Sequence, residues 1–123
     1  GQLKKITKDH SLVEHLIDEG MITREEAIHH PDKNVITRAL GVDDHITVDI
    51  FTKEISIYDK VLMCSDGLTN VVSDEMILET IMNHSMDEAV DILVEAANEA
   101  GGPDNITVIV GGFDTPEVEK EVE

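Results

Sequence analysis

Apolar and polar residues along this chain follow three patterns, and two of them indicate strands. A short continuous apolar run over residues 61–64 is typical of a buried strand, and its β-branched residue and the nearby glycine favour strand over helix. The run over 106–110 is of the same kind. Alternation over 46–52 and, more weakly, over 3–7 predicts half-buried strands, and the β-branched residues of 34–40 favour a further one.

The third pattern, with apolar residues three and four apart, predicts two short helices over residues 11–30. Each begins with a capping box, in which a hydroxyl accepts a backbone amide and a glutamate three residues later bonds back. The boxes start at Ser11 and Thr23, Gly20 ends the first helix, and Pro31 stops the second. The pair is polar on one face, which suits a segment that folds over a neighbouring surface.

Two longer helices are predicted over residues 73–100. Ser73 caps the first, and a third capping box at Ser85 opens the second, whose apolar stripe is typical of a helix lying on a sheet. Glycines and a proline at 101–103 end it. Strands, a helical insertion, strands, two helices and a last strand predict an α+β fold, with helices on one face of a mostly antiparallel sheet.

Composition narrows the class of protein. The 123 residues are enough for one domain, and with 2% aromatic residues its core must be aliphatic. A formal charge of −18 argues against nucleic-acid or anionic-membrane partners and suits cations or a basic partner, although solubility is the simpler explanation. The single cysteine, Cys64, and the lack of a long apolar segment lead us to expect a cytoplasmic protein. We expect residues 114–123 to form an acidic tail, and the chain, which does not start with Met, to be a piece of a longer protein.

Two aspartates stand at the ends of the two buried runs. Asp66 follows 61–64 and Asp104 precedes 106–110, so antiparallel pairing would bring both carboxylates into one cleft. Close carboxylates need a shared proton, a basic side chain or a metal, and oxygen ligands suit Mg²⁺, Mn²⁺ or Ca²⁺. The plainer interpretation is turn chemistry, because Asp-Gly and Asp-Asn are common in loops.

Four motifs in a fixed order give the chain a family resemblance. They are Leu3–Ser11, which contains Thr-Lys-Asp-His, Val35–Gly41, which contains Thr-Arg-Ala-Leu-Gly, Lys60–Leu68, which contains Ser-Asp-Gly, and Gly102–Val108, which contains Gly-Pro-Asp-Asn. Each is weak alone, but the ordered set resembles the C-terminal half of the metal-dependent Ser/Thr protein phosphatase 2C (PPM) family, bacterial type. The resemblance extends over residues 1–113.

The resemblance implies an α-β-β-α sandwich of antiparallel sheets, with aspartates at one edge binding two Mn²⁺ or Mg²⁺ ions. Asp66 and Asp104 match metal-binding aspartates of the family, and Gly67 and Asn105 match the positions that support them. In such enzymes a metal-activated water hydrolyses phosphoserine or phosphothreonine. Phosphorylated proteins as substrates and a cognate Ser/Thr kinase are the implied partners.

The family's N-terminal half has no counterpart in this sequence. That half carries the remaining metal ligands, the phosphate-binding arginine and the proposed general acid, so these residues have no counterpart either. No catalytic residue is therefore expected in this fragment, and we predict negligible phosphatase activity for it alone. It should pair with the missing half or self-associate, because a divided sandwich exposes sheet edges and an apolar face. Residues 11–30 correspond to a flap near the family's active site.

Two other functions remain open. A catalytically dead regulatory domain would keep the fold and bind a partner protein, but it has no need of paired aspartates. An acidic cation-binding module unrelated to phosphatases would carry the Thr-Arg-Ala-Leu-Gly motif only by chance.

Several reactive residue types are better explained by structure. Arg38 should make an ion pair near a strand end, and His10 a structural hydrogen bond beside the cleft. His29 and His30 are adjacent on a helix end and point apart, so solvation is favoured over metal binding. The apolar setting of Cys64 argues against a reactive thiolate.

Overall fold

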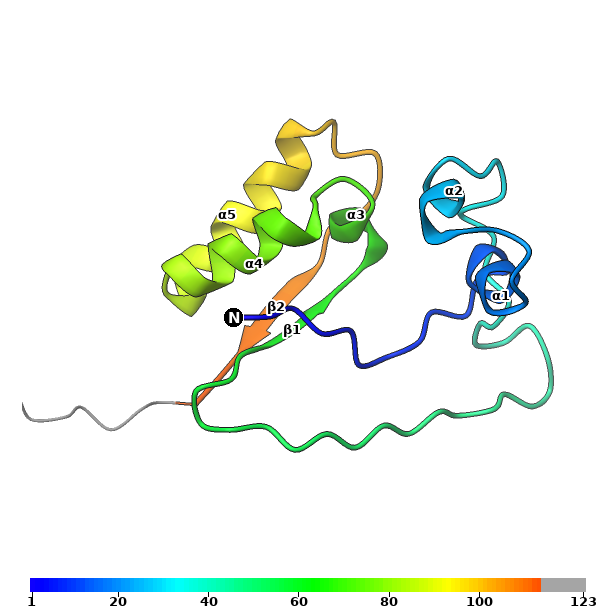
Figure 1. Ribbon diagram of the computed structural model, residues 1–123, viewed down its shortest axis with the longest axis horizontal. Helices are drawn as coiled ribbons and strands as arrows, with labels where there is room; N and C mark the ends of the chain where they lie inside the picture. Colours follow the sequence, from blue (N-terminus) through cyan, green and yellow to red (C-terminus); the bar gives the residue numbers. More distant parts are fainter. Residues whose placement is uncertain (114–123) are drawn as a thin grey trace, which may run out of the picture. The chain divides into compact units, whose positions relative to one another are not determined.

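Seven elements form in residues 1–113, the part of the chain that the computed structural model describes (Figure 1). In chain order they are α1 Leu12–Asp18, α2 Arg24–Ile28, β1 Val61–Cys64, α3 Asp66–Thr69, α4 Asp74–Asn83, α5 Met86–Glu99 and β2 Val108–Gly111. They divide into two compact units. The N-terminal unit is Lys5–Lys53, and the sheet unit comprises Gly1–Lys4 and the described residues from Glu54 onward.

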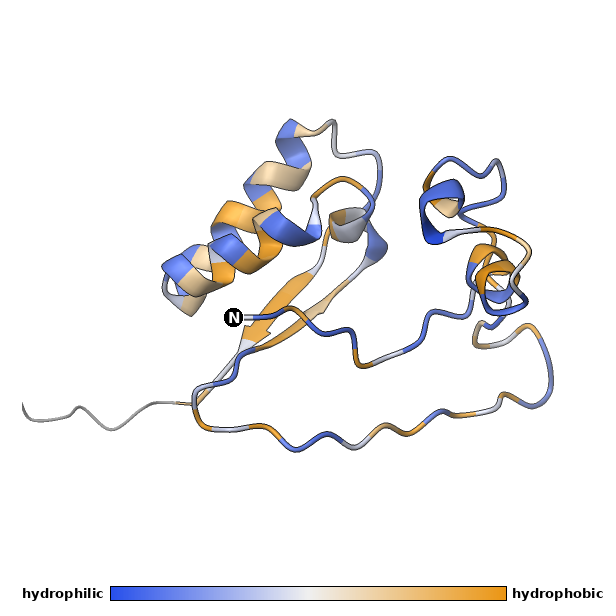
Figure 2. Cartoon of the chain, viewed as in Figure 1, coloured by the Kyte–Doolittle hydropathy of each residue, from blue (hydrophilic) through white to orange (hydrophobic). Residues whose placement is uncertain are grey.

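The sheet unit is built on an antiparallel pair of strands. β1 and β2 pair with Leu62 opposite Val110 and Cys64 opposite Val108. The helices lie over one face of this pair, and their apolar sides meet the strands in Figure 2. Leu68, Ile77 and Leu93 are fully buried between the layers, and strand residues pack against them. The two predicted apolar runs therefore do form neighbouring antiparallel strands, although β2 begins at Val108 rather than at residue 106.

Within the sheet unit, the other face of the strand pair carries exposed apolar side chains. Side chains alternate across a strand, so Met63 and Ile109 point away from the helices. These two residues face each other in the ladder and are 58% and 50% exposed. Two large apolar side chains at the centre of a sheet face are normally covered, so this face is available for contact with another layer.

Side-chain hydrogen bonds stabilise the ends of the helices in the sheet unit. The hydroxyls of Ser73 and Ser85 accept the amides of Met76 and Glu88, which satisfies a free donor at each N-terminus. At the other end of α4, the Lys60 ammonium donates to the carbonyls of Ile81 at 2.9 Å and His84 at 3.3 Å. A cation at a helix C-terminus is favoured by the helix dipole, so Lys60 ties the start of β1 to α4.

The N-terminal unit contains the predicted helical pair. Thr23 and Glu26 form a complete capping box at α2, whereas Ser11 accepts the Glu14 amide without the return bond. The Glu14 carboxylate instead accepts two bonds from Arg24, at 2.9 and 3.2 Å, which join the two helices. Gly20 follows α1 with a φ of 73°, the left-handed conformation that favours glycine at a helix end.

Three predicted strands are wrong as secondary structure. Residues 3–7, 34–40 and 46–52 form no strand, and the one ladder contact in this region is an isolated bridge between Ser11 and Ile36. Residues 46–52 follow an extended path (Figure 1) but have no neighbour in a ladder. Unlike a helix, a strand needs a second segment to pair with, and the described residues supply none.

The predicted α+β class is confirmed at the level of a two-stranded antiparallel sheet with helices. Among the described residues, no helix is long and apolar enough to cross a membrane. The predicted acidic tail, residues 114–123, lies outside the described residues.

Candidate metal centre

Two loops meet at one end of the strand pair in the sheet unit. β1 ends at Cys64 and leads into residues 65–67, and residues 104–107 lead into β2 at Val108. Because Cys64 pairs with Val108 in an antiparallel ladder, the end of β1 lies beside the start of β2. The loops that carry Asp66 and Asp104 are therefore neighbours, as the sequence predicted.

Ser65 fastens the two loops together. Its amide donates to the carbonyl of Thr107 at 3.0 Å, and the Thr107 amide donates to the Ser65 hydroxyl at 3.1 Å. The same hydroxyl donates to the carbonyl of Asn105 at 3.1 Å. We call these three bonds the clasp. They fix the spacing of the two loops by joining the Ser65 hydroxyl and amide to backbone groups of the facing loop.

Gly67 brings the loops closer than any other residue would allow. It is buried, and a Cβ at this position would overlap the carbonyl oxygen of Asn105. Glycine is therefore required by close backbone approach rather than by an unusual φ. This gives a physical reason for the Ser-Asp-Gly order at the end of β1.

The two carboxylates are held differently. Asp66 is the first residue of the short helix α3, directly after the clasp residue. Asp104 accepts the amide of Asn105 on its Oδ1 at 2.7 Å, which orients its carboxylate within the loop. Both side chains are exposed. Water therefore solvates both carboxylates, and neither incurs the cost of burying a charge.

These donors match the chemistry of a hard divalent cation but not its full coordination. Carboxylate oxygens are ligands that Mg²⁺ and Mn²⁺ prefer, and the clasp fixes the loops that carry both groups. Mg²⁺ takes six ligands, several of which are water. Within residues 1–113 no group of three or more His, Cys, Asp or Glu side chains is placed to hold a metal. The site is thus suited to contribute ligands to a larger metal centre.

A second polar cluster lies in the N-terminal unit. Asp49 accepts from His10 Nε2 at 2.7 Å and from Arg38 Nη1 at 3.1 Å, and the same Arg38 nitrogen reaches the Thr47 carbonyl at 2.9 Å. The hydrogen bond from Arg38, followed by that from His10, lowers the pKa of Asp49. Arg38 does form an ion pair and His10 a side-chain hydrogen bond, both with Asp49. No strand of the described residues ends near Arg38, so that part of the prediction is wrong, and the position of His10 beside the cleft stays a prediction.

Sequence reasoning missed the shared partner of these two residues, Asp49, and the role of Ser65. Asp49 lies on the polar side of the alternating residues 46–52, and that pattern assigns it no partner. A signal was available in the sequence. Arg38 and His10 both belong to the family motifs, and each side chain needs a hydrogen-bond acceptor, which a nearby aspartate can supply. The role of Ser65 depends on the register of β1 against β2, which no local pattern reveals.

The other residues set aside behave as structural groups. His30 Nδ1 accepts the Asp32 amide at 3.0 Å, which accounts for one of its ring nitrogens. His29 is exposed, as expected of a solvated helix end. Cys64 is half-buried and lies against the core.

Comparison with known proteins gives a consistent result. No family model matches the chain. It is 42% identical over 109 residues to the serine/threonine phosphatase stp of Listeria welshimeri. The aligned region covers 88% of this chain and 43% of the relative. The crystal structure of the Mycobacterium tuberculosis serine/threonine phosphatase PstP/Ppp matches with a TM-score of 0.85 and 43% identity, over 93% of this chain and 48% of that one.

A structure of the PstP catalytic domain in complex with two manganese ions matches with a TM-score of 0.75 and 43% identity, over 93% of this chain and 47% of that one. The chain thus spans a little under half the length of the Listeria relative and of both solved structures.

Proposed function

Because the chain belongs to the bacterial PPM family of serine/threonine phosphatases, we propose that residues 1–113 are the C-terminal half of a metal-dependent phosphoprotein phosphatase domain. The observation that carries the proposal is the clasp, which holds the loops of Asp66 and Asp104 side by side. The substrates of the proposed phosphatase domain are proteins phosphorylated on serine or threonine by a cognate kinase. With one cysteine and no disulfide to form within the chain, we place it in the cytoplasm.

Asp66 and Asp104 are the residues that hold Mn²⁺ or Mg²⁺ in this proposal, and Gly67 and Asn105 support them. A divalent cation bound there supplies Lewis-acid chemistry, since it lowers the pKa of water and offsets negative charge on a phosphoryl group. The chain's own contribution is to set the position of the two carboxylates. Ser65 and Gly67 fix the loop spacing, and the Asn105 amide orients Asp104.

The other half of the domain supplies the remaining ligands and the second sheet of an α-β-β-α sandwich. Two observations support this division. The described residues hold too few carboxylates for a complete metal centre, and the face bearing Met63 and Ile109 is left open. Alone, the chain should therefore have negligible phosphatase activity.

The competing function is a catalytically dead regulatory domain that binds a partner protein. It predicts no use for carboxylates on two clasped loops, whereas a phosphatase requires them. The presence of both Asp66 and Asp104 beside the clasp therefore favours the enzyme.

A chimera tests this proposal directly. The N-terminal half of the Listeria welshimeri relative is joined to residues 1–113 and assayed with a phosphothreonine peptide and Mn²⁺. Turnover is expected, and Asp66→Asn or Asp104→Asn should each reduce it at least about 100-fold, because each removes a charged metal ligand. Asp43→Asn, at an exposed turn position in the N-terminal unit, is the matched control and should change little.

A folded chimera without turnover, or one in which Asp43→Asn is as damaging as Asp66→Asn, would favour the regulatory domain. The isolated chain is assayed in parallel. Robust turnover by it alone would contradict the division of the site between two halves.

Residues 11–30 are proposed to act as a flap that selects protein substrates. Their helices are short and joined by the Arg24–Glu14 pair, with Ala27 as the single buried side chain. Deleting the segment from the chimera should lower turnover of a phosphoprotein more than that of a small phosphate ester. Equal effects on both substrates would contradict a selective role.

A further inference from the structure

The helices α1 and α2 of the N-terminal unit stand between two short stretches of chain that lie side by side. Residues 10–12 lead into α1, and residues 35–38 follow the turn after α2. We call these stretches the entry leg and the exit leg. Ser11 and Ile36 form an isolated antiparallel bridge between them. The proposed flap, residues 11–30, is therefore closed at its base.

Two backbone hydrogen bonds join the legs. The Leu12 amide donates to the carbonyl of Val35 at 3.0 Å, and the Thr37 amide donates to the carbonyl of His10 at 2.9 Å. Even a complete two-stranded hairpin is only marginally stable in water, and this pairing is shorter than a hairpin. Further contacts are therefore needed to keep the legs together.

The carboxylate of Asp49 supplies such a contact to each leg. Its Oδ2 accepts from the ring of His10, in the entry leg, at 2.7 Å. Its Oδ1 accepts from Arg38, in the exit leg, at 3.1 Å, and the same Arg38 nitrogen donates to the carbonyl of Thr47. We call His10, Arg38 and Asp49 the Asp49 cluster. One side chain thus bonds to both legs, with a different oxygen for each.

The Asp49 cluster is better shielded from water than the ion pair that joins α1 to the chain before the entry leg. The side chains of His10, Arg38 and Asp49 are 28%, 30% and 33% exposed. Those of the Lys8–Asp18 pair are 52% and 44% exposed. Because water and salt weaken an exposed pair more, the Asp49 cluster is the firmer hold on the flap.

Above the legs, the flap is braced internally. The guanidinium of Arg24 donates two bonds to the carboxylate of Glu14, at 2.9 and 3.2 Å, and so joins α2 to α1. A bidentate pair fixes the orientation of its two partners as well as their separation. Movement of the flap is therefore expected at its legs rather than between its helices.

We propose that Asp49 is a positioning residue for the flap, because it links the two legs and so holds α1 and α2 in one orientation within the N-terminal unit. Removing the carboxylate frees the legs and leaves the helices folded. The effect of flap orientation on substrates rests on the proposed function of residues 11–30. The link between the legs does not rest on it.

The link is tested in the 123-residue chain by amide hydrogen exchange, followed by NMR. Asp49→Ala should speed exchange at Leu12 and Thr37 at least about tenfold, because the bonds between the legs open more often. The Ala27 amide is bonded within the flap to the carbonyl of Thr23, and its exchange should change less than about twofold.

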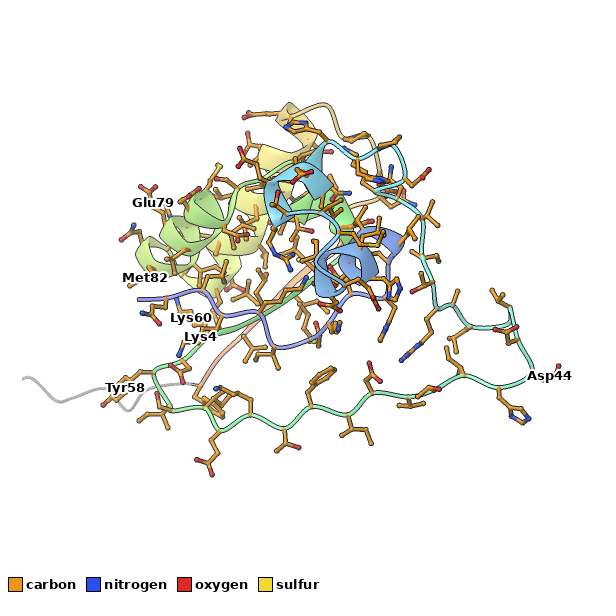
Figure 3. All side chains as sticks on the ribbon, turned by 45° about the vertical axis from the view of Figure 1, so that its right-hand side comes forward. Lys4, Asp44, Tyr58, Lys60, Glu79 and Met82 are labelled. Carbon is orange, nitrogen blue, oxygen red and sulfur yellow. The ribbon has the colours of Figure 1, made fainter. Side chains whose placement is uncertain are left out.

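Asp44→Ala is the matched control. Asp44 is exposed and lies at the outer bend of the turn that follows the exit leg (Figure 3). Its loss should change exchange at Leu12 and Thr37 less than about twofold. Equal acceleration by Asp44→Ala, or no acceleration by Asp49→Ala, would overturn the proposal. Acceleration at Ala27 as large as at Leu12 would show unfolding of the whole flap and would also overturn it.

A double variant separates one link from two independent contacts. If a single carboxylate joins the legs, His10→Phe and Arg38→Met each break the same link. His10→Phe/Arg38→Met should then speed exchange at the legs less than about twofold beyond the larger single effect. Additive effects would give each residue a contact of its own and would overturn the proposal.

The orienting role is tested in the chimera with the Listeria welshimeri N-terminal half. Asp49→Ala should raise KM for a phosphoprotein about fivefold and change kcat/KM for a small phosphate ester less than about twofold. An unchanged phosphoprotein KM, in a chimera whose phosphoprotein turnover does fall when residues 11–30 are deleted, would overturn this role. A chimera without turnover contradicts the proposed function instead, and the exchange rates still decide the link.

Discussion

The two units differ in how far they bury their aliphatic side chains. In the sheet unit, Leu68, Ile77 and Leu93 are fully buried between helices and strands. In the N-terminal unit, all of whose residues the structure describes, Ala27 is the one buried side chain. Val48 and Ile50 of its extended segment are mostly exposed. Apolar content alone therefore does not produce a core.

The two units differ because a helix makes its hydrogen bonds within one short segment, whereas a strand needs a second segment. α1 and α2 form because caps and i, i+4 bonds are local. The alternating residues 46–52 gain nothing until another strand or layer pairs with them. The sheet unit has such a pair in β1 and β2, and its helices have something to cover.

Truncating a core residue gives the largest expected contrast between the units. Leu93→Ala should lower the free energy of unfolding of the sheet unit by about 3 kcal/mol, because it leaves a cavity among close-packed side chains. Ile50→Ala, at a side chain that is 86% exposed, should cost less than about 0.5 kcal/mol. Urea denaturation followed by circular dichroism measures both. A similar loss from the two changes would show that Ile50 is packed in solution.

A smaller effect is expected from a methyl group at the clasp. Gly67→Ala should cost about 2 kcal/mol, because its Cβ has to displace the Asn105 backbone, and it should weaken Mn²⁺ binding by separating the loops. Gly20→Ala is the matched control in the N-terminal unit, where φ is 73° but space is open, and it should cost about 1 kcal/mol.

Mn²⁺ titration distinguishes the two glycines. Unchanged Mn²⁺ affinity in Gly67→Ala, or an equal loss in Gly20→Ala, would contradict a role for close loop spacing.

The smallest effect concerns the Asp49 cluster. The pKa of the Asp49 carboxyl is lowered below its ordinary value of 3.8, so the ionised carboxylate is favoured in the folded unit. This contribution to stability is present above pH 3.8 and is lost as the pH falls through the lowered value. Arg38→Met should raise the Asp49 pKa more than His10→Phe does, since the bond from Arg38 is the larger cause. Carboxyl NMR titration measures both, and the reverse order would contradict this ranking.

The sequence predicts this protein best where the determining contacts are close along the chain. Ser11, Thr23, Ser73 and Ser85 all cap helices, because a cap involves residues three apart. The full capping box that was also expected at Ser11 and Ser85 forms at Thr23 alone among these described helices. Strand 61–64 and its partner near 108 are also predicted correctly, since each lies in a short, mainly apolar run. The strands expected at 34–40 and 46–52 are wrong, because β-branched residues in the first and alternation in the second favour a strand without identifying the segment that pairs with it or covers it.

For the candidate site, antiparallel pairing was enough to bring the loops of Asp66 and Asp104 together. It was not enough to predict how closely. That depends on the Ser65 hydroxyl and the missing Cβ of Gly67, which act only once the register is fixed. The acceptor shared by His10 and Arg38 was missed for the same reason.

The clasp also has a kinetic consequence. Ser65 and Thr107 are separated by 42 positions, so their bonds close a long loop that contains α3, α4 and α5. The entropy of closing that loop opposes formation of the bonds, so we expect the clasp to form late in folding. A ligand that bridges the two loops would bind the native chain and not the unfolded one. Its occupancy would slow unfolding and would report the population of folded molecules.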